Sequence, residues 1–395
     1  MSETCQNKTL KIAFYCFFPG GGIGQYTHEL LKRLSEMEAV HVSLFCTPDF
    51  EWISRATYEV RPILYDISSQ HPLLRKMRFV SGQWISPSRM LKEVRKRRFD
   101  IVHFCNINHL SYPFWKRSLG RLKILKACTA HDIRRGKSIL NRTWETRQLK
   151  QFYRDTCPIF VHSESQIGDL ISFADISREG VVKVPLGPFS LGTATQIIAP
   201  TKSYSSPSKG LFFGNLRDEK NLDGLLRAMA KSKEDMRLTV AGKPGGSGHH
   251  SIAYYKRLAQ KLALGNKVDW IIRHIPDKEA HSLFQATDWV ALPYKNVFTS
   301  QSGVLNIATH YGKPILATPA PTFNEVFDQY PIGVLSRDMS DASITKALSK
   351  MVCKCRVKGA FDFSSYQRDH TWERNAELTL QAYRSQAMME LGFKS

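Results

Sequence analysis

Short apolar runs alternate with stretches of helical periodicity along most of the chain. Runs of four to eight residues predict strands, and in the first half they are Lys11–Phe17, Val40–Cys46, Tyr58–Tyr65, Asp100–Cys105, Ile124–Thr129, Pro158–His162 and Val181–Pro185. In the second half they are Gly210–Phe213, Met236–Ala241, Val268–Arg273, Trp289–Leu292 and Pro314–Ala317. Leucines at helical spacing, as in Gln25–Met37 and Leu222–Lys231, predict helices between the strands. This alternation is typical of α/β domains in which helices cover both faces of a parallel sheet.

A change of composition divides this pattern in two. Residues 191–209 are rich in Thr, Ser, Pro and Ala, which is typical of a linker. We therefore expect one doubly wound, Rossmann-like domain over residues 1–190 and a second over residues 210–370, followed by a terminal helix within residues 371–395. Ligands of such sheets bind beyond the carboxyl ends of the strands, so we expect the two domains to face a cleft there.

Length and composition exclude several classes of protein. The 395 residues are 42% hydrophobic, which is enough to build sizeable cores. The sequence has no apolar run of about 18 residues, and the run Ile12–Phe18 ends at Pro19-Gly20, so neither a spanning helix nor a signal peptide is predicted. The eight cysteines form no C-x-x-C pair, which favours reduced thiols over a zinc site. We expect a cytoplasmic protein without a bound metal.

The positive charge is concentrated in one part of the chain. The formal net charge is +21, and residues 55–150 hold 22 Lys and Arg against 6 Asp and Glu, an excess of 16. The other 299 residues therefore carry only +5. A basic region of this kind favours an anionic partner: a membrane surface, a polyanion, a nucleic acid or a phosphorylated substrate. Composition alone does not choose among these.

A cluster of glycines follows the first predicted strand. Gly20, Gly21, Gly22 and Gly24 stand between this strand and the helix expected from Gln25. Glycines allow a ligand to approach the backbone closely, and the N–H groups of a helix N-terminus favour anions. The residue at position 25 is Gln and no acidic residue ends the next strand, so the pattern differs from a dinucleotide-binding motif. A loop for a substrate or a phosphate and a simple tight turn both fit.

Two further segments of the second half contain candidate anion sites. Arg217 and Lys220 lie in the loop after the strand at 210–213, and a guanidinium fork with a point charge suits a diphosphate. Ser302 can cap the helix that follows it, which leaves the N–H groups of Ser302, Gly303 and Val304 free for an anion. Ordinary surface charges and an ordinary helix cap are the alternative interpretations.

The histidines differ in their expected positions. His131 and Asp132 follow the strand at 124–129, where a side chain can reach a ligand, whereas His103 lies within a strand and is expected to be buried and hydrogen-bonded. The sequence contains neither a D-x-D pattern nor a P-loop. Phosphate charge is therefore expected to be met by cations and helix termini instead of Mg²⁺.

Together these segments resemble the family 4 glycosyltransferases, which have the GT-B architecture. The resemblance is strongest in Gly214-Asn215-Leu216-Arg217, Val240-Ala241-Gly242-Lys243-Pro244, Ala286-Thr287-Asp288-Trp289 and Gly312-Lys313-Pro314-Ile315. In the first half it includes Gly20–Gly24, Thr129-Ala130-His131-Asp132, Val161-His162-Ser163-Glu164-Ser165 and Val182-Lys183-Val184-Pro185. The segment 371–395 is similar to the helix that returns to the first domain in this family.

This resemblance implies the transfer of a sugar from a nucleotide-sugar donor, with retention of configuration and without a bound metal. A UDP- or GDP-sugar would then be a co-substrate, with no bound cofactor. The acceptor would be a glycan or a lipid-linked molecule bound by the first domain. The resemblance implies catalytic roles for three residues, His131, Arg217 and Lys220, and donor binding by Gly22, Gly24, Ile275, Ser302, Gly303 and Val304.

One feature of the family is missing from the sequence. The family often has two glutamates eight residues apart before the Gly-x-Pro, and these positions hold Thr299 and Ile307 here. The donor base, the sugar, the acceptor and the linkage are therefore left open. Two other functions fit the same observations: a nucleotide-sugar epimerase or phosphorylase of the same fold, and a basic module that binds membranes or nucleic acid without catalysis.

The segment 75–98 interleaves basic residues with apolar ones such as Phe79, Trp84 and Met90. Such a pattern is typical of a segment that lies on an anionic membrane, and a solvated helix face over the domain core is the alternative. We expect peripheral attachment to the inner face of the membrane, beside the acceptor site. We do not expect a nucleic-acid partner.

Overall fold

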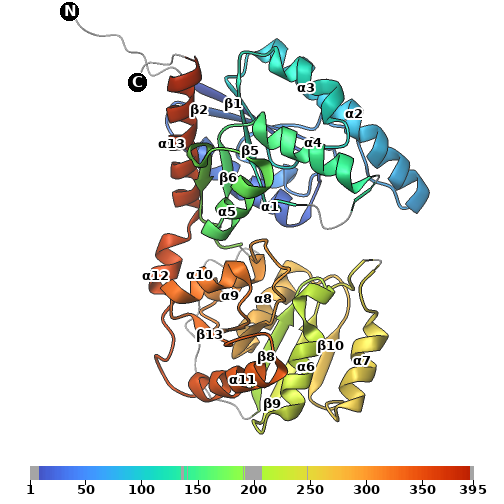
Figure 1. Cartoon of the computed structure of the whole chain (residues 1–395), viewed down its shortest axis with the longest axis vertical. Helices are drawn as coiled ribbons and strands as arrows, with labels where there is room; N and C mark the ends of the chain where they lie inside the picture. Colours follow the sequence, from blue (N-terminus) through green and yellow to red (C-terminus); the bar gives the residue numbers. More distant parts are fainter. Residues whose placement is uncertain are drawn as a thin grey trace, which may run out of the picture. The chain divides into compact units, whose positions relative to one another are not determined.

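The computed structural model describes residues 9–134, 138–139, 141–189, 191, 207–246 and 248–391. The chain divides into two compact units, Met1–Pro185 with Trp372–Ser395, and Leu186–Thr371 (Figure 1). Each unit has its own parallel sheet and its own core. Most of the linker expected at 191–209 lies outside the described residues.

The sheet of the first unit has the strand order β3-β2-β1-β4-β5-β6-β7, and its strands pair in parallel. The strands are β1 (Leu10–Cys16), β2 (Val40–Cys46), β3 (Glu59–Arg61), β4 (Ile101–Phe104), β5 (Leu125–Thr129), β6 (Ile159–Val161) and β7 (Val181–Lys183). The order reverses between β1 and β4, which is where doubly wound sheets bind their ligands. The apolar runs predicted these strands, although β3 is shorter than the run Tyr58–Tyr65.

Successive residues of these strands face different helices, as the period of two requires. Tyr15 packs in a core cluster with Met90 and Trp115. Phe14 instead stacks on the ring of His103, whose Nδ1 lies 2.6 Å from the Tyr383 hydroxyl. The helices of this unit are α1 (Gly21–Ser35), α2 (Pro72–Arg97), α3 (Tyr112–Gly120), α4 (Arg142–Arg154), α5 (Glu164–Ala174) and α13 (Trp372–Leu391).

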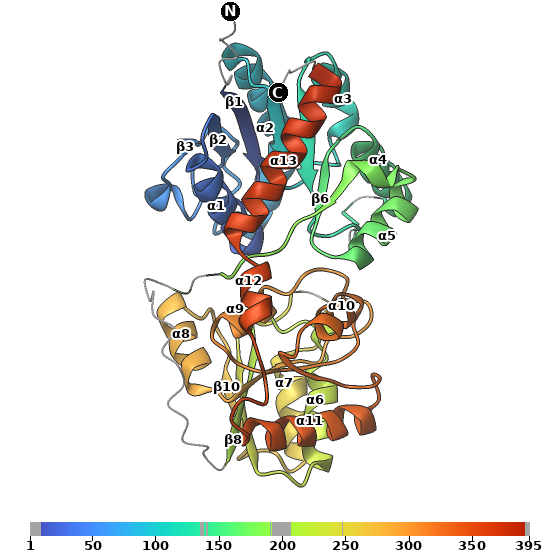
Figure 2. The same ribbon diagram turned by 90° about the vertical axis from the view of Figure 1, so that its left-hand side faces the viewer.

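The terminal helix α13 belongs to the first unit, as the resemblance implied. It contacts α1 and β5 and lies across the sheet (Figure 2). Asn375 donates a hydrogen bond from Nδ2 to the Pro185 carbonyl oxygen at 2.6 Å. His103 is buried and its Nε2 lies 2.8 Å from Thr129 Oγ1, which confirms its expected place in the core.

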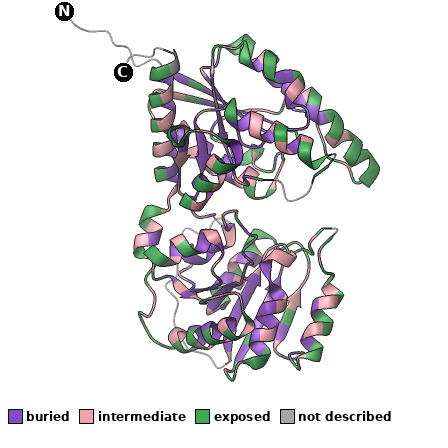
Figure 3. Cartoon of the chain, viewed as in Figure 1, coloured by how far each residue is buried: buried purple, intermediate pink, exposed green. Residues whose placement is uncertain are grey.

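The second unit has a parallel sheet with the strand order β10-β9-β8-β11-β12-β13. Its strands are β8 (Ser208–Phe213), β9 (Met236–Ala241), β10 (Val268–Ile271), β11 (Trp289–Leu292), β12 (Ile315–Ala317) and β13 (Gly333–Leu335). Its helices are α6 (Leu222–Lys231), α7 (Ile252–Lys261), α8 (Asp277–Ala286), α9 (Gly303–His310), α10 (Pro321–Gln329), α11 (Asp341–Cys355) and α12 (Ser364–Asp369). In both units the strands are largely buried and the outer faces of the helices are exposed (Figure 3).

The start of α1 differs from the sequence prediction. The helix begins at Gly21, four residues before the expected Gln25, so Gly22 and Gly24 lie in its first turn instead of in a loop. Gly21 has a φ of +71°, which favours glycine. A Cβ on Gly24 would lie 2.5 Å from Cζ3 of Trp52, so close packing requires glycine there. The cluster thus forms a tight turn and a helix N-terminus at once.

Candidate functional site

Lys220 is a buried cation at the carboxyl end of β8. It lies in a short 3-10 turn, Asp218–Lys220, and its Nζ donates to the Phe213 carbonyl oxygen at 3.3 Å. Nζ also lies 5.4 Å from the centre of the Tyr294 ring. Within the described ranges no carboxylate forms an ion pair with Lys220. Burial and, to a lesser extent, the charge of Arg217 lower the pKa of this ammonium from 10.5 to about 7, although the Glu219 carboxylate acts to raise it.

Two glycines bring Lys220 beside the start of α9. A Cβ on Gly214 would lie 2.9 Å from Lys220 Nζ and 3.7 Å from Cγ2 of Val304. Gly214 has a φ of +95°, and Gly242 one of +149°. A Cβ on Gly242 would lie 2.0 Å from the Gly214 carbonyl oxygen. The ends of β8 and β9 therefore pack closely enough to exclude any side chain at these positions.

Arg217 lies next to this cation but is more exposed. Its side chain is 42% exposed, and Nε lies 3.0 Å from Glu219 Oε1 in an ion pair that lacks the alignment of a hydrogen bond. Burial raises the pKa of the Tyr294 hydroxyl to about 12, although a hydrogen bond with Ser302 and the nearby charge of Arg217 both act to lower it. The guanidinium is thus available to an anion that can compete with one carboxylate.

The N-terminus of α9 forms the other wall of this region. Ser302 caps the helix by accepting a hydrogen bond from the Leu305 N–H, as its sequence predicted. The Tyr294 hydroxyl lies 3.5 Å from Ser302 Oγ. Gly303 packs against the ring of Phe189: a Cβ on Gly303 would lie 3.0 Å from Cε2 of that ring. The first N–H groups of the helix, beside a buried ammonium, make a positive environment without a metal.

The two positions at which the resemblance implied glutamates hold Thr299 and Ile307, and these two residues differ in burial. Ile307 is buried in α9, and Thr299 is exposed in the loop before it. Ile275, the residue implied for the nucleotide base, is 8% exposed in the loop between β10 and α8. Near it, Arg273 forms two ion-pair contacts of 2.7 Å with Glu279. With Thr299 and Ile307 in place of the two glutamates, no carboxylate is present at either position.

In the first unit, His131 follows β5 and His162 follows β6. His131 Nδ1 lies 3.3 Å from His162 Nε2, and His162 Nδ1 lies 3.2 Å from the Val184 carbonyl oxygen. Gln166 holds both strand ends: its Nε2 donates to the His131 carbonyl oxygen and its Oε1 accepts from the His162 N–H. Burial lowers the pKa of His162 to about 4 and holds that of His131 well below its usual value.

A ring of α1 packs against both histidines. The Tyr26 ring lies edge-on to His131 and His162, with centroid distances of 4.7 and 5.2 Å. Trp372 of α13 packs against Tyr26 at 5.4 Å. Sequence reasoning identified His131 alone in this group. His162 stood in a recognised motif, but only the parallel pairing of β5 and β6 reveals its contact with His131.

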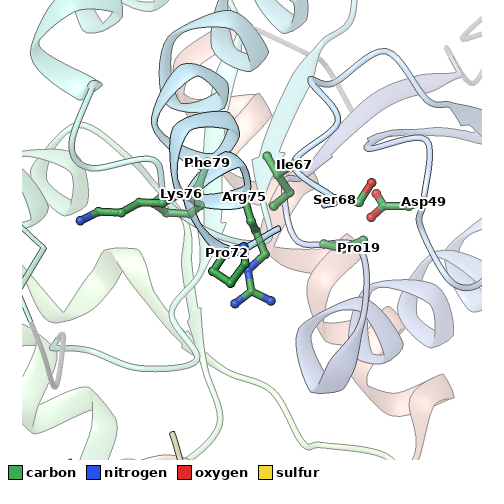
Figure 4. Close-up of a pocket in the computed structure, with 8 residues that line it drawn as sticks. All are labelled: Pro19, Asp49, Ile67, Ser68, Pro72, Arg75, Lys76 and Phe79. Atoms are coloured by element: carbon green, nitrogen blue, oxygen red, sulfur yellow. The ribbon is translucent and has the colours of Figure 1, made fainter. Parts of the chain in front are cut away.

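A pocket of about 430 Å³ opens in the first unit at the carboxyl ends of β1 and β2 (Figure 4). It is lined by Pro19, Asp49, Ile67, Ser68, Pro72, Arg75, Lys76 and Phe79. Arg75 and Lys76 extend from the first turn of α2, and Asp49 and Ser68 stand on the other side of the pocket. Phe79 also lines a smaller cavity of about 80 Å³ that contains Asn106 and Asn108.

Neither a metal-binding cluster nor a helix that could cross a membrane is found among the described residues. In the part of the chain that the structure covers, no group of three or more His, Cys, Asp or Glu side chains could hold a metal ion. Among the described helices, none combines the length and the apolar character needed to cross a bilayer.

Comparison with curated proteins finds two bacterial D-inositol 3-phosphate glycosyltransferases. Those of Salinispora tropica and Corynebacterium urealyticum are each 24% identical, over 245 and 261 residues respectively. The matches cover 57% and 62% of this chain. The chain thus spans only 50% and 61% of the length of these relatives.

Solved structures show the same fold over nearly the whole chain. The sucrose-phosphate synthase of Thermosynechococcus elongatus has a TM-score of 0.74 at 15% identity, with 96% of this chain and 100% of that chain covered. A glycosyltransferase of Rickettsia africae has a TM-score of 0.70 at 12% identity, with 98% and 100% covered. HepE of Anabaena, in complex with UDP and glucose, has a TM-score of 0.67 at 16% identity, with 97% and 100% covered. These likenesses confirm the expected GT-B fold class.

Two family models match consecutive parts of the chain. The model of glycosyltransferase family 4 matches residues 20–187, and that of the glycosyl transferases group 1 matches residues 194–356. Together they include every residue for which the sequence implied a role in donor binding or catalysis. The predicted family is therefore confirmed, and the chain belongs to the family 4 glycosyltransferases.

Proposed function

We propose that this chain transfers a sugar from a nucleoside-diphosphate sugar to an acceptor hydroxyl, with retention of configuration and without a metal. The observation that carries the proposal is Lys220, a buried ammonium beside Arg217 and the N-terminus of α9. Burying a cation without an anionic partner is costly. A diphosphate would supply the missing partner, and the negative charge that develops as it leaves is what such a group stabilises.

Each of the remaining candidates has a distinct role in this proposal. Arg217 exchanges its contact with Glu219 for the diphosphate, and the N–H groups of Ser302, Gly303 and Val304 bind the same group. Ile275 borders the base. In the first unit, His131 contacts the transferred sugar, and the first turn of α1, with Gly22 and Gly24, binds near the diphosphate. HepE is described in complexes with UDP and with UDP-glucose, which supports a UDP-sugar as the donor.

Donor binding is tested by a thermal-shift screen with UDP-glucose, UDP-galactose, UDP-N-acetylglucosamine and GDP-mannose. A ligand that binds only the folded state stabilises it by about 2.7 kcal/mol at a hundredfold excess over Kd. Arg217→Ala and Lys220→Ala are expected to abolish the shift, whereas Lys209→Ala, which removes an exposed cation of β8, preserves it. Equal shifts in all three variants would contradict the assigned roles.

We propose the pocket of about 430 Å³ at the start of α2 as the acceptor site. Arg75 and Lys76 favour an acceptor with a phosphate or carboxylate group, while Asp49 and Ser68 suit hydroxyls. The curated relatives are named for D-inositol 3-phosphate, so this compound and unphosphorylated inositol form a matched pair of test acceptors. We expect Arg75→Ala to raise the KM for an anionic acceptor and to leave the KM for the donor unchanged. The same change in both constants would exclude the pocket as the acceptor site.

We also propose that α2 attaches the chain peripherally to an anionic membrane, where a lipid-linked acceptor can be reached. Its first turns are exposed and lie at one edge of the unit (Figure 1). The exposed apolar side chains Leu73, Met77, Val80 and Trp84 recur at helical spacing. Eight Lys and Arg stand on this helix against one acidic residue, Glu93. Burial of apolar area and attraction between cationic side chains and anionic lipids are the two contributions that bind such helices to a lipid surface.

Flotation with vesicles measures this binding and tests the contribution of the apolar side chains. Vesicles of phosphatidylcholine with 30% phosphatidylglycerol are expected to bind the chain at low salt, and Met77→Ser with Trp84→Ser to weaken binding about tenfold. Val357→Ser removes an apolar side chain of the second unit that is as exposed as that of Met77, and serves as the control. Failure of the native chain to float at low salt would refute membrane attachment and leave the proposed transfer reaction untouched.

A further inference from the structure

The hydrogen bonds of the two histidines define which atom His131 offers to a ligand. His162 Nδ1 lies 3.2 Å from the Val184 carbonyl oxygen, which can only accept a hydrogen bond. Nδ1 of His162 therefore carries a proton. In a neutral imidazole the other nitrogen, Nε2, is then an acceptor.

The same reasoning about donors and acceptors applies to His131. Its Nδ1 lies 3.3 Å from the accepting Nε2 of His162, so Nδ1 of His131 must donate. The second nitrogen of His131, Nε2, is left with a bare lone pair. Both rings are neutral at neutral pH, because burial lowers the pKa of His162 to about 4 and that of His131 well below its usual value.

The surroundings hold this arrangement in one geometry. Tyr26 packs edge-on against both rings, and Gln166 joins the backbone of the two strand ends. His131 Nε2 is shielded from solvent and makes no hydrogen bond within the described part of the chain. A buried acceptor that makes no hydrogen bond is costly, so this atom is prepared for a donor that the described part of the chain does not provide.

We propose that His162 is a positioning residue that keeps His131 protonated on Nδ1, so that His131 Nε2 accepts a hydrogen bond from a hydroxyl of the transferred sugar. This inference rests on the proposed function, because it specifies the contact between His131 and the donor. It has a chemical consequence: the sugar hydroxyl must donate. A fluorine in its place cannot donate, so a fluoro sugar is expected to lose as much affinity as a deoxy sugar.

The tautomer is measured directly in the full-length chain without any ligand. A long-range ¹H–¹⁵N spectrum of ¹⁵N-histidine-labelled protein at pH 7.5, assigned with His131→Gln, is expected to show His131 with a protonated Nδ1 and a bare Nε2. His162→Leu is expected to abolish this pattern, because Nδ1 loses its acceptor. His162→Gln is expected to retain it through its side-chain carbonyl oxygen. A protonated Nε2 of His131 in the native chain would overturn the inference, even if His162→Leu does not fold.

A matched control removes another buried imidazole from the same sheet. His103 stacks between Phe14 and Phe160, so His103→Phe keeps the packing and loses the hydrogen bonds to Thr129 and Tyr383. We expect this variant to be less stable but to keep the His131 tautomer. Loss of the tautomer in His103→Phe as well would show that general destabilisation, not His162, sets it.

The third test measures kcat/KM. Its substrate is the nucleotide sugar, among the four compounds of the thermal-shift screen, that supports turnover. His162→Leu is expected to lower kcat/KM about 10- to 100-fold, the loss that one unmade buried hydrogen bond implies, and His162→Gln to recover most of it. Unchanged kinetics in His162→Leu would refute the positioning role. If the tautomer is as described and no nucleotide sugar binds, the proposed function fails while the arrangement of the histidines stands.

Discussion

Lys220→Met removes the buried ammonium and keeps the length and volume of the side chain. Burial lowers the pKa of Lys220 from 10.5 to about 7, which corresponds to a cost of at most about 5 kcal/mol for holding the charged form in the folded state. The cation–π contact with Tyr294 and the hydrogen bond to Phe213 offset part of this cost. The thioether of Met can contact the same ring. We therefore expect the variant to be more stable than the native chain by about 1–3 kcal/mol at pH 6.5, while it loses donor binding.

The pH dependence of this difference in stability shows whether the charge of Lys220 causes it. Between pH 7 and 10.5 the unfolded chain holds a proton on Lys220 that the folded chain has released. The unfolded state thus binds more protons, and the free energy of unfolding of the native chain rises with pH in this window. Below pH 7 both states are protonated and the full cost is present. The advantage of Lys220→Met is therefore expected to be largest at pH 6.5 and to shrink steadily towards pH 10.

Thermal unfolding without ligand, followed from pH 6.5 to 9.5, measures this difference. For a unit of this size, 1 kcal/mol shifts Tm by about 2–4 °C, so an increase of several degrees at pH 6.5 is expected. Other groups titrate in both proteins and cancel in the difference. A variant that is less stable than the native chain, or a difference that does not change with pH, would refute the idea that Lys220 is an unpaired buried cation.

The same cation predicts that donor binding takes up protons. At pH 8 most Lys220 side chains are neutral, because burial lowers their pKa to about 7. A bound diphosphate raises this pKa again, so the binding of UDP is expected to take up nearly one proton. Calorimetry in HEPES and in Tris, which differ in ionisation enthalpy, measures this number. Lys220→Arg stays charged at pH 8 and is expected to take up none; equal uptake by this variant would assign the proton to another group.

Three further changes test the scaffold. Gly242→Ala is expected to destabilise the second unit by more than about 2 kcal/mol in chemical denaturation, because its Cβ would lie 2.0 Å from the Gly214 carbonyl oxygen and its φ is +149°. Gly246→Ala, with open space around its Cβ, is the matched control and is expected to stay within about 0.5 kcal/mol of the native chain. Glu145→Ala removes a buried carboxylate that accepts from the Ile139 N–H and lies 3.1 Å from His109 Nε2, and a loss of about 3 kcal/mol is expected in the same assay. A neutral result for Gly242→Ala or Glu145→Ala would contradict the packing described here.

The sequence predicted the strands well because both faces of a parallel sheet are covered. Such strands are continuous apolar runs with abrupt ends, and Met236–Ala241 and Trp289–Leu292 match the observed bounds. The glycine cluster was harder to interpret. Glycine has a low helix propensity, so the sequence predicted a loop at Gly22 and Gly24. Both lie within the helix, and close packing against Trp52 makes glycine necessary at position 24.

The place of Arg217 and Lys220 in the fold was predictable from the sequence, but their burial was not. Arg217 and Lys220 follow a strand, so their place at a sheet edge could be inferred from spacing alone. Their difference in burial could not be inferred in this way. Both are cations three residues apart, yet Lys220 is buried under Tyr294 while Arg217 is 42% exposed. This difference depends on Gly214 and Val304, which the chain brings together only after β8 and α9 have packed. No pattern along the sequence records that contact.

Among the described residues of the candidate site, the ammonium of Lys220 in the second unit has no carboxylate in an ion pair, and Nε2 of His131 in the first unit has no hydrogen-bond donor. Each reduces the stability of the unit that contains it, and each could be removed by an apolar side chain of similar size. They also require opposite ligands, because an ammonium needs an anion and a bare lone pair needs a hydrogen-bond donor. A nucleoside-diphosphate sugar offers both, an anionic diphosphate and a hydroxylated ring. If stability and activity compete at these positions, Lys220→Met and His131→Phe should each stabilise the chain and stop transfer. A variant that gains stability and keeps its activity would show that burial at that position is structural.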